Sequence, residues 1–208
     1  MCSSTSTLIT TSGSLGCEPV AGLRAIRWAA AKPTSNVRKV LVIGPGGSGK
    51  TTVACRIAAA TGLPLLHLDS LYWRPGWVPT PDRDWDRMVA ELVARDAWVM
   101  DGNYGRTLAI RLAACDTVVF LDPPRYLCLW RLLKRRWQYA GRRRPDLPEG
   151  CPERLTWGFL QWVWSYHARR RPTVLQHLAV VADRVAVFTL QTNTDVATFL
   201  ARLTPAAA

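Results

Sequence analysis

Short apolar runs alternate with segments of helical periodicity along most of the chain, and this alternation predicts its secondary structure. We expect strands over residues 40–43, 63–68, 97–100, 117–121 and 185–190. Helices are expected over residues 49–61, 81–95, 107–113, 123–139, 153–170, 172–182 and 195–203. Strands that alternate with helices favour an α/β fold, in which a parallel sheet is covered by helices on both faces.

The first 36 residues do not share this pattern. They are rich in Ser, Thr, Gly and Ala and lack sustained periodicity, so we expect a disordered N-terminal extension. A transit peptide is the alternative, suggested by Arg24, Arg27 and Lys32 beside a single acid, Glu18. Residues 37–208 are expected to form one domain.

The first apolar run, Val40–Ile43, leads into the sequence G-P-G-G-S-G-K-T-T, which matches the phosphate-binding P-loop. Its glycines permit positive φ and leave the backbone N–H groups open to a phosphate at the start of a helix. Lys50 is expected to reach the β- and γ-phosphates of ATP, and Thr51 to bind Mg²⁺ through its hydroxyl. The expected nucleotide-binding residues follow one another along this loop and helix start: Gly44, Gly46, Gly47, Ser48, Gly49, Lys50, Thr51 and Thr52.

Three acids follow apolar runs directly, at the carboxyl ends of expected strands, where parallel sheets bind ligands. Asp101 is expected to lie beside the P-loop and support Mg²⁺, provided that its strand neighbours the first one. Asp122 has the same pattern, but it also suits an N-cap for the helix that begins at Pro123. Asp69 suits a base or an orienting group for an acceptor hydroxyl, or a loop cap.

Aromatic residues cluster just after Asp69, on a loop that contains Pro75 and Gly76. Such a cluster suits stacking on a flat acceptor, and it equally suits a small satellite core. We expect Tyr72 to face an acceptor pocket and Trp77 to belong to the core.

A basic segment follows Asp122: residues 123–172 contain twelve Arg or Lys and three acids. Arg131, Arg135 and residues 142–144 bracket a Gly- and Pro-rich loop, so we expect an Arg-rich lid at about residues 140–153. Arginines on a lid suit a transferring phosphoryl group, because the guanidinium contacts its oxygens in pairs. A solvated basic face and a nucleic-acid backbone site are the alternatives.

Composition limits the class of protein further. The net charge is +12 and the pI about 10.1, which suits phosphate handling and permits polyanionic partners. No apolar run reaches the length of a membrane span, so no membrane partner is expected. The six cysteines form no C-x-x-C pair, which favours reduced thiols in a cytoplasmic protein. His67, His167 and His177 form no metal-ligand pattern.

The chain resembles the adenylate-kinase-like small P-loop kinases, and among them most of all the bacterial topology-modulation (FlaR-type) proteins. The resemblance covers about residues 38–203 and is carried, in order, by I-G-P-G-G-S-G-K-T-T, L-D-S-L-Y-W-R-P-G-W, W-V-M-D-G-N-Y, F-L-D-P-P-R, W-R-L-L-K-R-R and R-R-P-D. It implies a five-stranded parallel sheet of order 2-3-1-4-5, an acceptor-binding segment, a lid, and use of ATP and Mg²⁺.

The resemblance also implies roles for particular residues. Asp101 corresponds to the magnesium-side acid, Arg131 and Arg135 to lid arginines, and Arg106 to a contact of the acceptor phosphate. Asn103 and Tyr104 stand where nucleotide kinases have Phe-Pro, which leaves the usual monophosphate acceptor open.

Two functional hypotheses follow from the sequence. The first is an ATP-dependent phosphotransferase that acts on a small acceptor, either a nucleoside monophosphate or a non-nucleotide. The second is a nucleotide-dependent, DNA-associated regulator that uses the basic segment. The sequence predicts neither the acceptor nor an oligomeric state.

Overall fold

The protein is described by a computed structural model, which covers residues 37–139, 150–152 and 155–203. The expected extension over residues 1–36 and most of the expected lid lie outside the described residues. Among these residues, no helix is both long and apolar enough to cross a bilayer.

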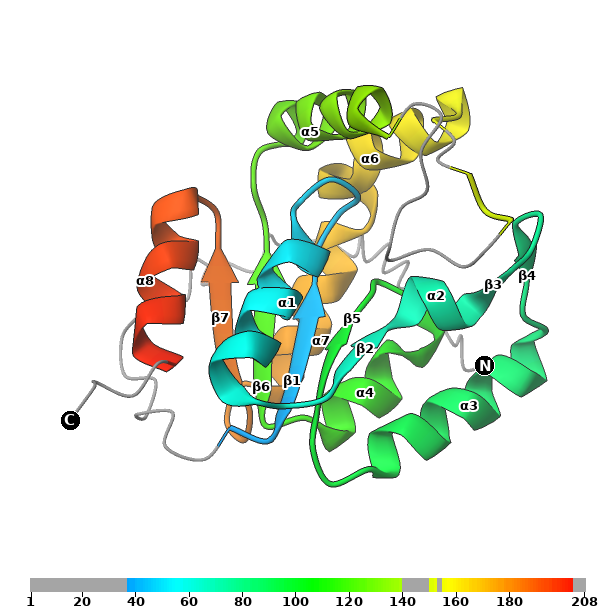
Figure 1. The fold of residues 1–208 in the computed structure, drawn as a ribbon. Coiled ribbons are helices and arrows are strands. Elements are labelled where there is room, and N and C mark those ends of the chain that lie inside the picture. Colours follow the sequence, from blue (N-terminus) through cyan, green and yellow to red (C-terminus); the bar gives the residue numbers. More distant parts are fainter. Residues whose placement is uncertain (1–36, 140–149, 153–154, 204–208) are drawn as a thin grey trace, which may run out of the picture.

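A five-stranded parallel sheet forms the centre of the fold (Figure 1). Its strands pair in the order β2-β5-β1-β6-β7, and β1 pairs with both β5 and β6. This confirms the expected order, since β5 is the third strand of this sheet along the chain. The strands are β2 (Leu65–His67), β5 (Trp98–Asp101), β1 (Lys39–Ile43), β6 (Thr117–Leu121) and β7 (Ala186–Leu190).

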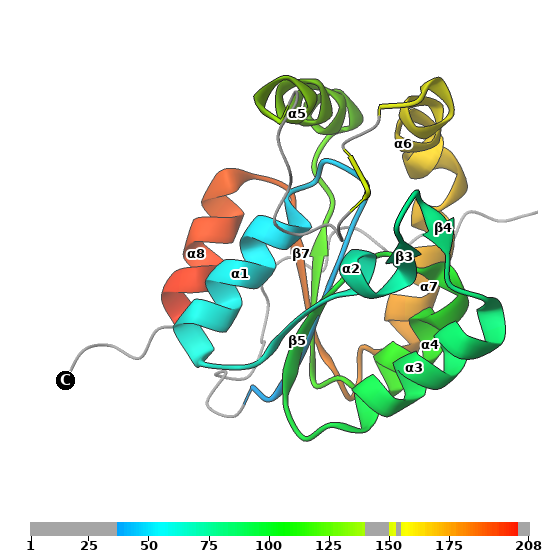
Figure 2. The same cartoon turned by 45° about the vertical axis from the view of Figure 1, so that its right-hand side comes forward.

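Helices cover both faces of this sheet and also its carboxyl edge (Figure 2). One face is covered by α1 (Lys50–Thr61) and α8 (Asn193–Leu203). The other is covered by α3 (Asp82–Ala94), α4 (Leu108–Ala114) and α7 (Arg171–Val181). Above the carboxyl edge lie α5 (Arg125–Gln138) and α6 (Trp157–Arg169). The two apolar cores on the two faces explain why the strands read as continuous apolar runs.

The segment after β2 differs from expectation. The expected strand over residues 63–68 ends at His67, and Asp69 lies in the first turn of the short helix α2 (Leu68–Tyr72) instead of at a strand end. The chain turns there because the Leu68 side chain is fully buried in the core. Leu68 also packs so closely on Gly102 that a Cβ at Gly102 would lie 2.7 Å from the Leu68 Cβ.

The aromatic loop forms a small hairpin of β3 (Trp73–Arg74) and β4 (Val78–Pro79). It turns through Gly76 and Trp77, which both have positive φ. Backbone and side-chain hydrogen bonds join the hairpin to residues 150–152: Gly76 N donates to Gly150 O, and Trp77 Nε1 donates to Pro152 O. The hairpin therefore contacts the described end of the expected lid.

Candidate active site

The P-loop joins β1 to α1 and passes directly under α5. A Cβ at Gly47 would lie 2.3 Å from the carbonyl oxygen of Cys128 on α5, and φ at Gly47 is 77°. Glycine is required there both by the close approach of α5 and by the backbone conformation. Gly49, the N-cap of α1, has φ 97°, and no side chain of the described residues caps that helix. The first N–H groups of α1 are thus left for an anion.

These residues fit a phosphate chain. Ser48 Oγ is buried and has no hydrogen-bond partner among the described residues, so it is available to a phosphate oxygen. Lys50 Nζ donates to the carbonyl oxygen of Pro45 at 3.0 Å, which holds the ammonium over the loop. Burial lowers the pKa of Lys50, and the charges of Asp69 and Asp101 oppose this shift.

Asp101 ends β5 next to the start of α1, as expected. Its Oδ2 accepts a hydrogen bond from Thr51 Oγ1 at 2.9 Å, and its side chain is buried. Its Oδ1 lies 2.7 Å from His67 Nδ1 on β2, a partner that the sequence analysis missed. The β2–β5 register creates this contact, because it sets His67 directly opposite Asp101.

Thr51 and Asp101 are the described residues that could hold Mg²⁺ at this site. No group of three or more His, Cys, Asp or Glu among the described residues could hold a metal by itself. Mg²⁺ in nucleotide sites takes one or two protein ligands, and phosphates and water complete its shell. A hydroxyl and a carboxylate that already touch fit that requirement.

On the other side of the P-loop, Asp69 accepts a hydrogen bond from the hydroxyl of Tyr104 at 2.7 Å. Burial raises the pKa of Tyr104, and the neighbouring charge of Asp69 raises it further, so the hydroxyl stays a donor. Both residues line the cleft. The structure thus brings Asp69 from α2 and Tyr104 from the loop after β5 together in the cleft.

The aromatic residues near Asp69 occupy the reverse of the expected places. Tyr72 packs against Trp85 and Tyr104, with ring centroids 5.0 and 4.6 Å away, and belongs to the core. Trp73 and Trp77 line the cleft instead. The cause is the turn of α2, which points Tyr72 inward toward α3.

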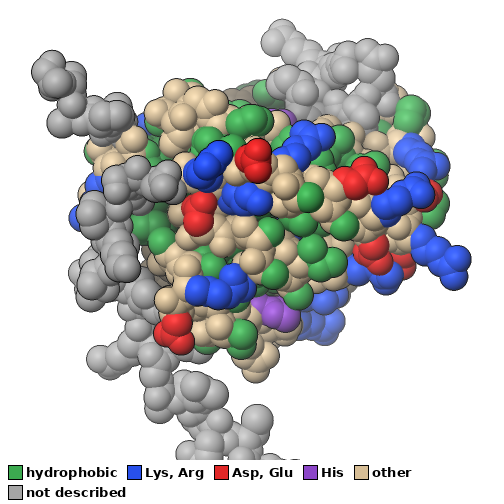
Figure 3. Space-filling model, turned by 90° about the horizontal axis from the view of Figure 1, so that it is seen from below, with side chains coloured by type: hydrophobic (Ala, Val, Ile, Leu, Met, Phe, Trp, Pro, Cys, Tyr) green, Lys and Arg blue, Asp and Glu red, His purple; other side chains and the backbone are tan. Residues whose placement is uncertain are grey.

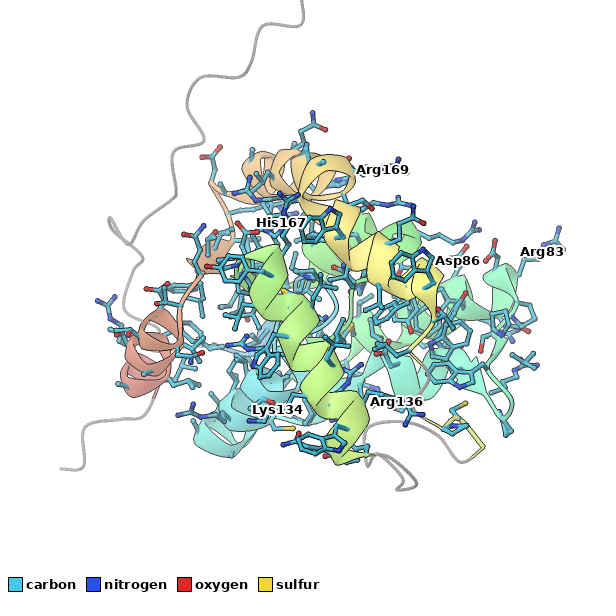
Figure 4. The ribbon with its side chains drawn as sticks, turned by 90° about the horizontal axis from the view of Figure 1, so that it is seen from above. Arg83, Asp86, Lys134, Arg136, His167 and Arg169 are labelled. Carbon is cyan, nitrogen blue, oxygen red and sulfur yellow. The ribbon has the colours of Figure 1, made fainter. Side chains whose placement is uncertain are left out.

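Arg106 lines the cleft, but its guanidinium is held by acids of α3 (Figure 4 labels Asp86). Its Nε and Nη2 donate to Asp86 at 3.0 and 2.8 Å, and Nη1 lies 3.1 Å from Asp82. The hydrogen bonds to Asp86 raise the pKa of Arg106 above its usual value. An acceptor phosphate would have to compete with two carboxylates for this group.

The basic helix α5 brings two arginines to the P-loop. Arg131 Nη1 donates to the carbonyl oxygen of Ser48 at 3.0 Å, and Nη2 donates to Asn193 Oδ1 at 2.9 Å. Arg135 lines the cleft, and its charge contributes to the lowered pKa of Lys50. Residues 142–144, the remaining expected lid arginines, lie outside the described residues.

Arg111 on α4 is a buried residue that the sequence analysis did not identify. Its guanidinium is fully buried and donates to the carbonyl oxygens of Gly102, Tyr104 and Thr107. Burial lowers its pKa to about 10. These bonds fix the loop that carries Asn103 and Tyr104 into the cleft. The signal in the sequence was a lone arginine within an otherwise apolar helix.

Asp122 does not cap α5. Pro124 is the N-cap of α5, and within the part of the chain that the structure describes no side chain caps this helix. Asp122 is buried, accepts a hydrogen bond from Arg171 Nε at 2.9 Å, and lies 3.4 Å from His167 Nε2. It therefore anchors the junction of α6 and α7 to the end of β6.

A cleft of about 1750 Å³ lies above the carboxyl edge of the sheet, and Lys50, Thr51 and Asp69 line it. Asp101 adjoins the cleft through its hydrogen bond with Thr51. The P-loop and α5 line one part of it. Asp69, Asn103 and Tyr104, together with Tyr166 and Arg170 of the α6–α7 region, line another. The cleft therefore has room for a nucleotide and for a second small molecule beside it.

No family model and no curated protein sequence matches the chain. Among solved structures, shikimate kinase from Acinetobacter baumannii in complex with shikimate aligns with a TM-score of 0.53 and 20% identity, over 81% of this chain and 91% of that chain. A shikimate kinase from Bacteroides thetaiotaomicron gives 0.47 and 16%, over 81% and 96%. A gluconokinase from Sinorhizobium meliloti gives 0.45 and 21%, over 80% and 93%. The first of these shows that the chain has the fold of a small P-loop kinase.

Proposed function

We propose that the protein is an ATP-dependent phosphotransferase that transfers the γ-phosphoryl group of ATP to a hydroxyl of a small acceptor. One observation carries the proposal: the P-loop lysine, the Thr51–Asp101 pair and Asp69 line or adjoin a single cleft on the carboxyl edge of the sheet. Phosphoryl transfer requires positioned charges around donor and acceptor, and little covalent chemistry from the protein.

On the donor side, the uncapped start of α1 and the Ser48 hydroxyl bind the phosphate chain. Lys50 exchanges its bond to Pro45 O for phosphate oxygens and neutralises developing charge there. Thr51 and Asp101 would hold Mg²⁺, which supplies further charge neutralisation at the phosphates when bound. Arg131 and Arg135 approach the same place from α5, where arginine stabilises a transferring phosphoryl group.

On the acceptor side, Asp69 accepts the proton of the acceptor hydroxyl or orients that hydroxyl. Tyr104 donates to Asp69 and fixes the direction of its carboxylate. Asn103 and Tyr166 line the same part of the cleft, and the Tyr166 hydroxyl is buried beside Asn103. With Arg106 held by Asp82 and Asp86, a non-nucleotide acceptor is favoured over a nucleoside monophosphate. The resemblance to topology-modulation proteins stays a prediction.

A panel of acceptors tests this proposal. ADP production from ATP and Mg²⁺ is followed with shikimate, simple sugars, hydroxy acids and nucleoside monophosphates. We expect turnover with at least one hydroxylated acceptor, and a loss of more than about 10³-fold in Lys50→Ala. Arg83→Ala, on the outer side of α3, is the matched control for removal of one cation and should keep full activity. Equal turnover in Lys50→Ala would refute the mechanism.

A further inference from the structure

The outer face of α5 carries a row of large apolar side chains that the nucleotide site does not use. Tyr126, Trp130, Leu133 and Trp137 are exposed over 70%, 64%, 50% and 85% of their surface. At 3.6 residues per turn these positions fall within an arc of roughly 60°, so they form one strip, here named the α5 stripe. Contiguous apolar groups with this exposure mark an interaction surface.

The fold itself uses the opposite side of α5. Cys128 and Leu132 are fully buried there and pack with Val163 of α6. Arg131, on this inner side as well, bonds to the P-loop. The helix therefore has two apolar faces, and the core accounts for only one of them.

Basic residues border the α5 stripe. Of the cations of this helix, Arg125, Lys134 and Arg136 are exposed, whereas Arg131 and Arg135 face the P-loop and the cleft, and the helix contains no acid. Figure 4, which looks down on this surface, shows Lys134 and Arg136 on opposite sides of α5. The guanidinium of Arg125 lies 4.2 Å from the ring centroid of Trp164 on α6, which extends the aromatic surface beyond α5. On the opposite, lower face of the molecule, acidic and basic side chains are interspersed (Figure 3).

These charges decide which occupant suits the stripe. The spacing i, i+4, i+7, i+11 is also that of a helix–helix seam, but it spans fewer than two heptads. In a second copy, moreover, Lys134 and Arg136 would meet like charges across the seam. Single-stranded nucleic acid binds in a basic groove that follows its backbone, whereas the stripe lies along one convex helix face. An anionic surface with an apolar layer beneath it matches both the cations and the tryptophans.

We propose that the α5 stripe docks on the surface of an anionic lipid bilayer, with α5 lying in the plane of the interface. Trp130, Leu133 and Trp137 enter the boundary between headgroups and acyl chains, where tryptophan and tyrosine are enriched. Lys134 and Arg136 contact the anionic headgroups on either side. Our expectation of no membrane partner rested on the lack of a spanning segment, and this mode of binding needs none.

Sedimentation of the full-length protein with vesicles tests the proposal. One set of vesicles is phosphatidylcholine alone, and the other contains roughly one third phosphatidylglycerol. We expect binding to the anionic set, weakened by added salt and reduced at least about tenfold in the double variant Trp130→Ser/Trp137→Ser. Arg136→Glu should weaken binding independently. Val180→Ser, an 82% exposed apolar residue on α7, is the matched control and should bind like the wild type.

Four results would overturn the proposal. The first is no binding of the wild type to anionic vesicles at low salt. The second is equal binding of the wild type and the double variant, when circular dichroism shows that the variant is folded. A dimer in sedimentation velocity that the double variant abolishes would assign the stripe to a second copy. Binding to single-stranded DNA without binding to vesicles would assign it to nucleic acid.

Discussion

The close contact between the P-loop and α5 can be tested by comparing alanine substitutions at two glycines. Gly47 and Gly62 both adopt left-handed backbone, with φ 77° and 71°. A Cβ at Gly47 would lie 2.3 Å from Cys128 O and 2.9 Å from Leu132 Cγ, whereas a Cβ at Gly62 meets nothing within 4 Å. Alanine at either position thus carries the same backbone strain, and only Gly47→Ala also forces α5 away from the loop.

The shared strain is about 1 kcal/mol and cancels in the comparison. Overpacking at Gly47 adds about 1–3 kcal/mol, because a helix backbone has to move. For a domain of this size, each 1 kcal/mol lowers Tm by about 2–4 °C, so Gly47→Ala should melt roughly 2–12 °C below Gly62→Ala. The displacement of α5 also separates Arg131 from Ser48 O, so ATP binding should weaken in Gly47→Ala alone.

Differential scanning calorimetry and titration of ATP into each variant measure the two effects. Equal melting temperatures would show that α5 does not press on the P-loop as the structure describes. A lower Tm in Gly47→Ala with unchanged ATP affinity would support the packing of α5 on the P-loop. It would refute the link between α5 and nucleotide binding.

Three further predictions concern single side chains. Tyr104→Phe removes the hydrogen-bond donor to Asp69 and should lower kcat/KM for the acceptor about tenfold, while the KM for ATP stays unchanged. Equal losses of kcat/KM for the acceptor and for ATP would contradict an acceptor role. Arg131→Ala should lower kcat about 10²-fold with little change in Tm, and unchanged steady-state kinetics would remove Arg131 from the mechanism. Burial raises the pKa of Cys115 to about 12, so at pH 8 iodoacetamide should modify the exposed Cys55 well before Cys115, as peptide mass spectrometry can show; equal rates would contradict the burial of Cys115.

The P-loop and its flanking strand and helix were largely predictable because their signals are local. A buried strand, a glycine-rich turn and a helix start are encoded within residues 40–52, and each depends on neighbours in sequence. The place of Asp101 beside Thr51 was also predictable, since the carboxyl ends of adjacent parallel strands meet at one edge. The strand order that makes them adjacent came from the resemblance, and the β1–β5 pairing confirms it.

The proposed acceptor side depends on contacts between residues far apart in the chain. Burial of Leu68 against Gly102 places Asp69 in the short helix α2. This helix brings the Asp69 carboxylate to Tyr104 and points Tyr72 into the core. Burial of Arg111 under the loop of residues 102–104 satisfies three backbone carbonyls that no local pattern marks. Sequence periodicity records which residues are buried, and only the packed tertiary structure determines which buried groups meet.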